Sequence, residues 1–170
     1  MVANQIAQND ERRSKYLFPE NGYIFAKTQL VVNTSDNRTD LSQFEGATLG
    51  GVANDYFTDL LEEYNEANGN PFTIRSYEDY TGLFMDISNG RVEGTCNDDI
   101  VIGYQSSHLG LKLKCVGEVL DYAYSFFLLP QTDAGRDLKA KVDKALQEVI
   151  ADGSLRALCI EWFGADYTTE

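Results

Sequence analysis

Over the middle of the chain, short apolar runs alternate with stretches whose apolar residues recur every three or four positions. Short runs are typical of strands, and the wider spacing is typical of helices that bury one face. The pattern predicts strands at 47–52, 72–76, 92–97 and 111–116, and helices at 57–64, 80–87 and 99–106. Strand–helix alternation of this kind favours an α/β fold with a mostly parallel, doubly wound sheet.

The pattern is less regular outside this stretch. Short strands are predicted at 2–6, 29–32 and 122–129. A helix is expected to begin after Asn9, because asparagine is a favoured N-cap residue. Two helices close the chain, and Ser154 is predicted to cap the second. The buried side of that last helix is predicted to hold Leu155, Leu158, Cys159 and Trp162.

Composition narrows the classes of function. The chain has 170 residues and a net charge of −13, from 14 basic and 27 acidic residues. A nucleic-acid-binding protein needs a basic footprint, and an anionic membrane surface repels such a chain. Apolar runs are too short to span a bilayer, and no signal peptide is recognisable at Met1. The 3 cysteines are widely spaced and the chain has 1 histidine, so we expect buried thiols and no zinc site or other cofactor.

Asp98 is the most informative candidate for chemistry. It follows the strand predicted at 92–97, and ligands of open α/β sheets bind at the carboxyl ends of strands. An ionised aspartate there suits a cationic group such as an amine. The alternative is that Asp98 only caps the next helix, since aspartate is a favoured N-cap residue.

Arg12 is the second candidate. It lies near a predicted helix start, where its guanidinium could hold a carboxylate through two hydrogen bonds. The alternative is an ordinary surface ion pair. Together, Arg12 and Asp98 would form a clamp for a zwitterion. The glycine-rich segment 46–51 lacks a phosphate-loop motif, so we interpret it as close packing of a strand on a helix.

Several segments in order resemble the polar-amino-acid solute-binding proteins of ABC importers, which have the type II periplasmic-binding-protein fold. Residues 6–18, with Asp10-Glu11-Arg12 and the Tyr-Leu-Phe-Pro that follows, resemble the family's T-x-E-R…F-S-x-P-Y segment. The other similar segments are 41–64, 80–98, 116–118 and 152–164, the last ending in Trp162-Phe163-Gly164.

The resemblance implies an α/β, periplasmic-binding-protein-like fold with one complete doubly wound lobe and one incomplete lobe. Residues 1–32 and 121–170 would form the incomplete lobe 1 with its hinge strands, and residues 33–120 would form lobe 2. Family members carry a further segment before the point that matches Met1, and this segment would begin lobe 1. An incomplete lobe would expose a sheet edge and an apolar face, so we expect a homodimer joined through lobe 1.

By the same resemblance, Arg12 matches the residue that binds the ligand's carboxylate and Asp98 the residue that binds its amine. Asn54, Asp55 and Tyr56 lie where the family has further binding residues, often with Gly-Thr or Gly-Ser in place of Asn54-Asp55. The implied function is binding of a polar amino acid for an ABC permease, at the cell surface or in the periplasm, without catalysis. The alternatives are a dehydratase-like enzyme on the same fold and a ligand-sensing module of a receptor.

Overall fold

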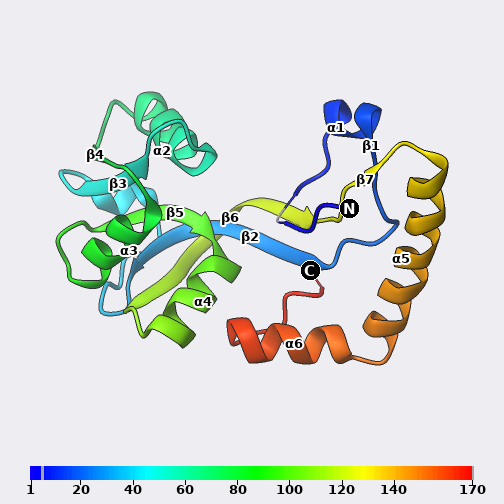
Figure 1. The fold of residues 1–170 in the computed structure, drawn as a ribbon. Coiled ribbons are helices and arrows are strands. Elements are labelled where there is room, and N and C mark those ends of the chain that lie inside the picture. Colours follow the sequence, from blue (N-terminus) through cyan, green and yellow to red (C-terminus); the bar gives the residue numbers. More distant parts are fainter. Residues whose placement is uncertain (5, 170) are drawn as a thin grey trace. The chain divides into compact units, whose positions relative to one another are not determined.

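The computed structural model describes residues 1–4 and 6–169 and divides the chain into two compact units. Unit 1 holds residues 1–26 and the chain from Tyr122 onward, and unit 2 is Lys27–Asp121. The chain passes from one unit to the other twice, once within strand β2 (Ile24–Asn33) and once within strand β6 (Leu113–Ser125) (Figure 1). Each unit is described below by itself.

Unit 2 is built on a five-stranded sheet with the order β4-β3-β5-β2-β6. Strand β3 (Thr48–Val52) runs parallel to β4 (Thr73–Tyr77) and to β5 (Gly94–Asp98). The predicted parallel, doubly wound arrangement is therefore confirmed for these three strands. Strand β2 runs antiparallel to β5, so the sheet as a whole is mixed.

Helices cover both faces of this sheet. They are α2 (Tyr56–Ala67), α3 (Tyr80–Ser88) and α4 (Asp99–Leu109), with a 3-10 turn η1 at Leu41–Phe44. Alternate residues of β2 serve two cores, because successive side chains of a strand point to opposite faces. Val32 packs with Leu61 of α2, and Val31 packs with Leu83 of α3 and Ile102 of α4.

The glycines of β3 allow the helices to approach the sheet closely. A methyl group placed on Gly50 would lie 2.1 Å from the Leu83 side chain of α3. One placed on Gly51 would lie 2.6 Å from the Thr58 side chain of α2. The interpretation of this segment as close strand–helix packing is confirmed, with one glycine serving each face.

Unit 1 holds α1 (Asp10–Lys15), the antiparallel pair β1 (Tyr16–Leu17) and β7 (Leu129–Pro130), and two longer helices. These are α5 (Asp133–Ala151) and α6 (Ser154–Phe163), which contact each other. Asn9 caps α1 as predicted, with its side chain accepting from the Arg12 amide. No helix within residues 1–4 and 6–169 is both long enough and apolar enough to cross a membrane.

Three predicted elements differ in the structure. In place of a strand at 2–6, Val2 forms a single bridge to Leu128, while Gln5 lies outside the described residues. The strands predicted at 111–116 and 122–129 are largely one strand, β6, which continues through Gly117 at φ 78°. A left-handed residue inside a strand is easy for glycine, and sequence spacing cannot show that pairing continues on both sides of it.

The last helix also differs from its prediction. Its N-cap is Gly153, with φ 77°, and Ser154 is its first residue. Cys159 is buried as expected, but Leu158 is 52% exposed and Trp162 is 49% exposed. The apolar side of α6, which was predicted to face a core, is therefore buried at Cys159 and about half exposed at Leu158 and Trp162.

Candidate functional site

Strands β3, β4 and β5 are parallel, so their carboxyl ends lie at one edge of the unit 2 sheet. The chain then enters α2, α3 and α4 respectively. The register pairs Leu49 with Gly94, and continuing it brings Val52 level with Asn97. Asp55, three residues after Val52, and Asp98, one residue after Asn97, therefore meet at the same edge.

Asp98 is the N-cap residue of α4, but its side chain makes no capping hydrogen bond. Its Oδ1 instead accepts a hydrogen bond from the Thr28 hydroxyl at 2.8 Å, across the antiparallel pair of β2 and β5. Burial raises the pKa of Asp98, and the Asp99, Asp121 and Asp55 carboxylates raise it further, while the Thr28 hydrogen bond lowers it. Such a carboxylate gains stability when a cation binds it.

Asp99 has a different partner. Its Oδ1 accepts a hydrogen bond from the backbone amide of Lys27 at 2.9 Å. Burial raises its pKa, while this hydrogen bond lowers it. The two adjacent aspartates therefore bind different residues of β2: Asp98 accepts from the Thr28 side chain and Asp99 from the Lys27 backbone.

Asp55 begins α2 and ties it to α3. As N-cap residue it accepts from the Phe57 amide at 3.0 Å, and its Oδ2 accepts from the Tyr80 hydroxyl at 2.5 Å. Burial and the Asp55 charge raise the pKa of Tyr80 above its usual range, so this hydroxyl stays protonated and donates. The Asp55 carboxylate is thus held in place from two sides.

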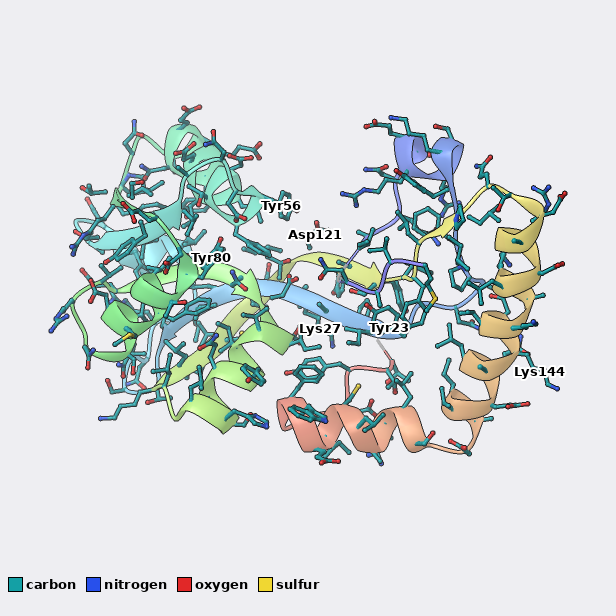
Figure 2. All side chains as sticks on the ribbon, in the orientation of Figure 1. Tyr23, Lys27, Tyr56, Tyr80, Asp121 and Lys144 are labelled. Carbon is teal, nitrogen blue, oxygen red and sulfur yellow. The ribbon has the colours of Figure 1, made fainter. Side chains whose placement is uncertain are left out.

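Tyr56, the first residue of α2, donates its hydroxyl proton to the carboxylate of Asp121 in β6 (Figure 2). The Asp121 hydrogen bond, burial and the charges of Asp121, Asp98 and Glu63 raise the pKa of Tyr56 to about 12. Tyr56 is nevertheless 48% exposed, so its ring is accessible at this edge. Two hydrogen-bonded tyrosine–carboxylate pairs, Tyr56–Asp121 and Tyr80–Asp55, therefore lie at the same edge of the sheet as Asp98.

Asn54 lies in a different environment. It has a left-handed backbone, with φ 59°, in the turn between β3 and α2. It lines a pocket of about 340 Å³ between α2 and the strands β3 and β4, together with Thr58, Glu62 and Ser76. Asp98, Asp121 and Tyr80 are not among the lining residues of that pocket.

Arg12 belongs to unit 1. Its amide donates to Asn9 Oδ1 at 2.8 Å, and its Nη1 donates to the Ala7 carbonyl at 2.8 Å. Among the described residues it forms no ion pair, so the surface ion pair considered for it is not what the structure holds. A guanidinium carries five N–H donors, so the bond to the Ala7 carbonyl uses only one of them.

Sequence reasoning missed Thr28, Tyr80 and Asp121, whose side chains contact Asp98, Asp55 and Tyr56 respectively. Tyr80 could have been found, because it opens the helix after a parallel strand, as Asp98 does. Thr28 could not, since its place opposite Asp98 depends on the register of an antiparallel pair that links distant parts of the chain. Asp121 joins this edge only because β6 continues past Gly117.

The sequence profile of the bacterial extracellular solute-binding proteins, family 3, matches residues 1–165. The chain belongs to this family. Within it, the chain is 34% identical to the "Probable amino-acid-binding protein YxeM" of Bacillus subtilis (strain 168), over 99% of this chain and 63% of that protein. It is 30% identical to the "L-cystine-binding protein TcyK" of the same organism, over 100% of this chain and 63% of that protein.

Solved structures of the family have the same fold. The crystal structure of the probable amino-acid ABC transporter extracellular-binding protein ytmK from Bacillus subtilis matches with a TM-score of 0.80 and 28% identity. The match covers 96% of this chain and 70% of that one. The periplasmic-binding-protein-like fold expected from the sequence, with one lobe incomplete, is thereby confirmed. The chain spans 63% of the length of the two curated relatives named above.

Proposed function

We propose that this chain takes part in binding a polar α-amino acid for uptake by an ABC importer. Its family consists of extracellular solute-binding proteins, and its relatives are described as amino-acid-binding and L-cystine-binding proteins. The observation that carries the proposal within the chain is Asp98. This carboxylate is half-buried at the carboxyl edge of the sheet, and its side chain does not cap the helix that it begins.

In the proposed mechanism, the two units correspond to the two lobes of the family, with lobe boundaries near 32 and 121 and hinge strands at β2 and β6. Asp98 of unit 2 takes the ligand's α-ammonium, and Arg12 of unit 1 takes its α-carboxylate. Asn54, Asp55 and Tyr56 complete the unit 2 side. A ligand that contacts both lobes favours the closed state, because only that state makes both sets of contacts.

The proposed role involves no bond making or breaking. A dehydratase-like enzyme would need a positioned acid or base, and the aspartates of this edge are engaged by Thr28, the Lys27 amide, Tyr80 and Tyr56. No specific observation favours the receptor module. We further propose that the protein delivers its ligand to an ABC permease and that it acts in the periplasm or at the cell surface.

We also propose that the chain forms a homodimer through unit 1. The support is the half-covered apolar stripe of α6, in which Leu158 is 52% exposed and Trp162 is 49% exposed. Exposed apolar patches favour association, and a second copy presents the same patch around a two-fold axis.

Titration of the isotope-labelled chain with single L-amino acids, followed by NMR, tests the binding proposal. A ligand should shift the amide signals of Asp98 and Asp99. Asp98→Asn and Arg12→Ala should each weaken binding by about thirtyfold, because each removes one partner of a charge-assisted contact. Asp79→Asn is the matched control, since Asp79 caps α3 through the Gly82 amide at 2.9 Å and asparagine caps nearly as well. Unchanged affinity in both site variants would refute the proposal.

A further inference from the structure

Strands β2 and β6 each run through both units, and side chains hold the residues beside the two crossing points. One crossing lies between Ala26 and Lys27 in β2, and the other lies between Asp121 and Tyr122 in β6. Because both strands are continuous at these points, the contacts of the neighbouring residues decide where the chain can bend.

On the unit 2 side, two helix starts hold the crossing strands. Asp99, the first residue of α4, accepts a hydrogen bond from the Lys27 amide at 2.9 Å. Tyr56, the first residue of α2, donates its hydroxyl proton to the carboxylate of Asp121 (Figure 2). Hydrogen bonds to an ionised carboxylate are stronger than those between neutral groups. We call these two contacts the unit 2 anchors, and each acts on the residue next to a crossing.

On the unit 1 side, Phe25 of β2 is held by contacts of two kinds. Its ring stacks on Tyr122, with centroids 5.6 Å apart and planes at 16°, and it meets the Tyr124 ring at 4.7 Å. Its amide donates to the Tyr167 carbonyl at 2.7 Å, and its side chain is 3% exposed. Buried aromatic contacts and a backbone hydrogen bond therefore fix β2 and β6 to each other within unit 1.

Very little chain separates the two sets of contacts. In β2 only Ala26 lies between Phe25 and Lys27, and in β6 Asp121 and Tyr122 are consecutive. A hinge consists of a few residues whose backbone angles change while the residues around them keep their contacts. The contacts of both units therefore leave one residue of β2 and one peptide link of β6 for such a change.

We propose that motion between the two units is confined to Ala26 and to the Asp121–Tyr122 link, and that Tyr56 is a positioning residue that limits motion at this link. The inference rests on the proposed function only in taking the units as lobes that move. Tyr56 is 48% exposed at the carboxyl edge where Asp98 is proposed to bind the ligand's ammonium. A ligand that contacts the Tyr56 ring would thus act, through its hydroxyl, on β6 at the crossing point.

Residual dipolar couplings of the backbone amides locate the hinge in the unaltered chain without any ligand. Couplings of unit 1, including Phe25 and Tyr122, should fit one alignment tensor. Those of unit 2, including Lys27 and Asp121, should fit another. A change spread over several residues of β2 or β6, or one tensor for both units, would overturn the proposal.

Two variants of α2 test the anchor on β6. Tyr56→Phe keeps the ring and removes the hydroxyl, so the Asp121 coupling should depart from the tensor of unit 2, and the two tensors should differ more in magnitude. Tyr64→Phe removes a hydroxyl from the same helix and should leave both tensors as they are. A Tyr56→Phe chain that is less stable but has unchanged tensors would show that this contact only supports the fold, which would overturn the role of Tyr56.

Two variants of Asp99 test the anchor on β2. Asp99→Asn keeps an oxygen for the Lys27 amide and should keep the Lys27 coupling within the tensor of unit 2, whereas Asp99→Ala should lose it. Equal Lys27 couplings in the two variants would overturn this anchor. Titration with single L-amino acids decides the proposed function separately. If they bind but the couplings fail the test, the hinge is wrong and the function stands, and if none binds while the couplings pass, the function fails and the hinge stands.

Discussion

The Thr28 hydroxyl donates a hydrogen bond of 2.8 Å to Oδ1 of Asp98, linking the antiparallel neighbours β2 and β5 at the carboxyl edge of the unit 2 sheet. The bond directs the carboxylate toward β2 and away from the amides of α4. The bond fixes the direction of the Asp98 carboxylate in the absence of a ligand. The Thr28–Asp98 hydrogen bond therefore links the packing of unit 2 to the proposed binding of the ligand's ammonium group by Asp98.

Removing this hydroxyl should weaken unit 2. Thr28 is 2% exposed, so Thr28→Val leaves a half-buried carboxylate without its donor, and we expect a loss of about 1.5–3 kcal/mol in unfolding free energy. Urea denaturation measures it. Thr95→Val is the control, since Thr95 is 1% exposed and its hydroxyl makes only a 3.4 Å contact with a backbone carbonyl. Equal losses in the two variants would show that the Asp98 contact has no special weight.

Ionisation of Asp98 should oppose folding. Because burial raises its pKa in the folded state, the folded chain holds this proton to higher pH than the unfolded chain. The contribution of Asp98 to stability is therefore full below its unfolded pKa and falls as the pH rises through the folded one.

Asp98→Asn removes the cost of ionising a half-buried carboxyl group. The variant should therefore be more stable than the unaltered chain at pH 7. The difference should shrink toward pH 4. Thermal unfolding of both chains across this range measures it. A variant less stable than the unaltered chain at pH 7 would mean that the ionised carboxylate has a stabilising partner.

The two glycine environments predict opposite effects of a methyl group. Gly50→Ala places a methyl 2.1 Å from Leu83 and should cost about 1–3 kcal/mol of unfolding free energy. Gly82→Ala lies in α3 with its nearest neighbours at 3.8 Å, and it should stabilise the helix by about 0.5–1 kcal/mol. Denaturant titration of both variants checks the prediction. A neutral Gly50→Ala would show that α3 can move away from the sheet.

Self-association through unit 1 can be tested at the exposed stripe of α6. Light scattering at micromolar concentration should give the mass of a dimer for the unaltered chain. Leu158→Glu and Trp162→Glu should give a monomer, because they place charge in an apolar contact. Met85→Glu is the control, since Met85 is 50% exposed on unit 2. A monomer for the unaltered chain, with a cooperative melt, would contradict the prediction.

The parts of the fold that could be predicted are those that depend on local spacing. The alternation from β3 to α4 follows from periodicity and helix caps, and the parallel order of β3, β4 and β5 follows from that alternation. The length of β6 could not be predicted, because Gly117 is read as a break unless its pairing partners are known. The exposure of Trp162 could not be predicted either, since amphipathic spacing shows which side is apolar but not whether anything covers it.

The candidate site was predictable to a similar degree. Asp98 follows from the rule that ligands meet the carboxyl ends of parallel strands, whereas Asp55 was predicted only from the family resemblance. Their environment does not follow from that rule, because Thr28 and Asp121 reach the edge through β2 and β6, whose register depends on long-range pairing. The alternative of a simple helix cap for Asp98 could be decided only from the direction of its side chain.

The most direct measurement is an NMR titration of the 170-residue chain with L-cystine and L-lysine, comparing the unaltered chain with Asp98→Asn and Asp79→Asn. The account predicts shifts that start at Asp98 and Asp99, an affinity about thirtyfold weaker in Asp98→Asn, and no change in Asp79→Asn. Binding of either amino acid with equal affinity in all three chains, or at signals far from this edge, would contradict it.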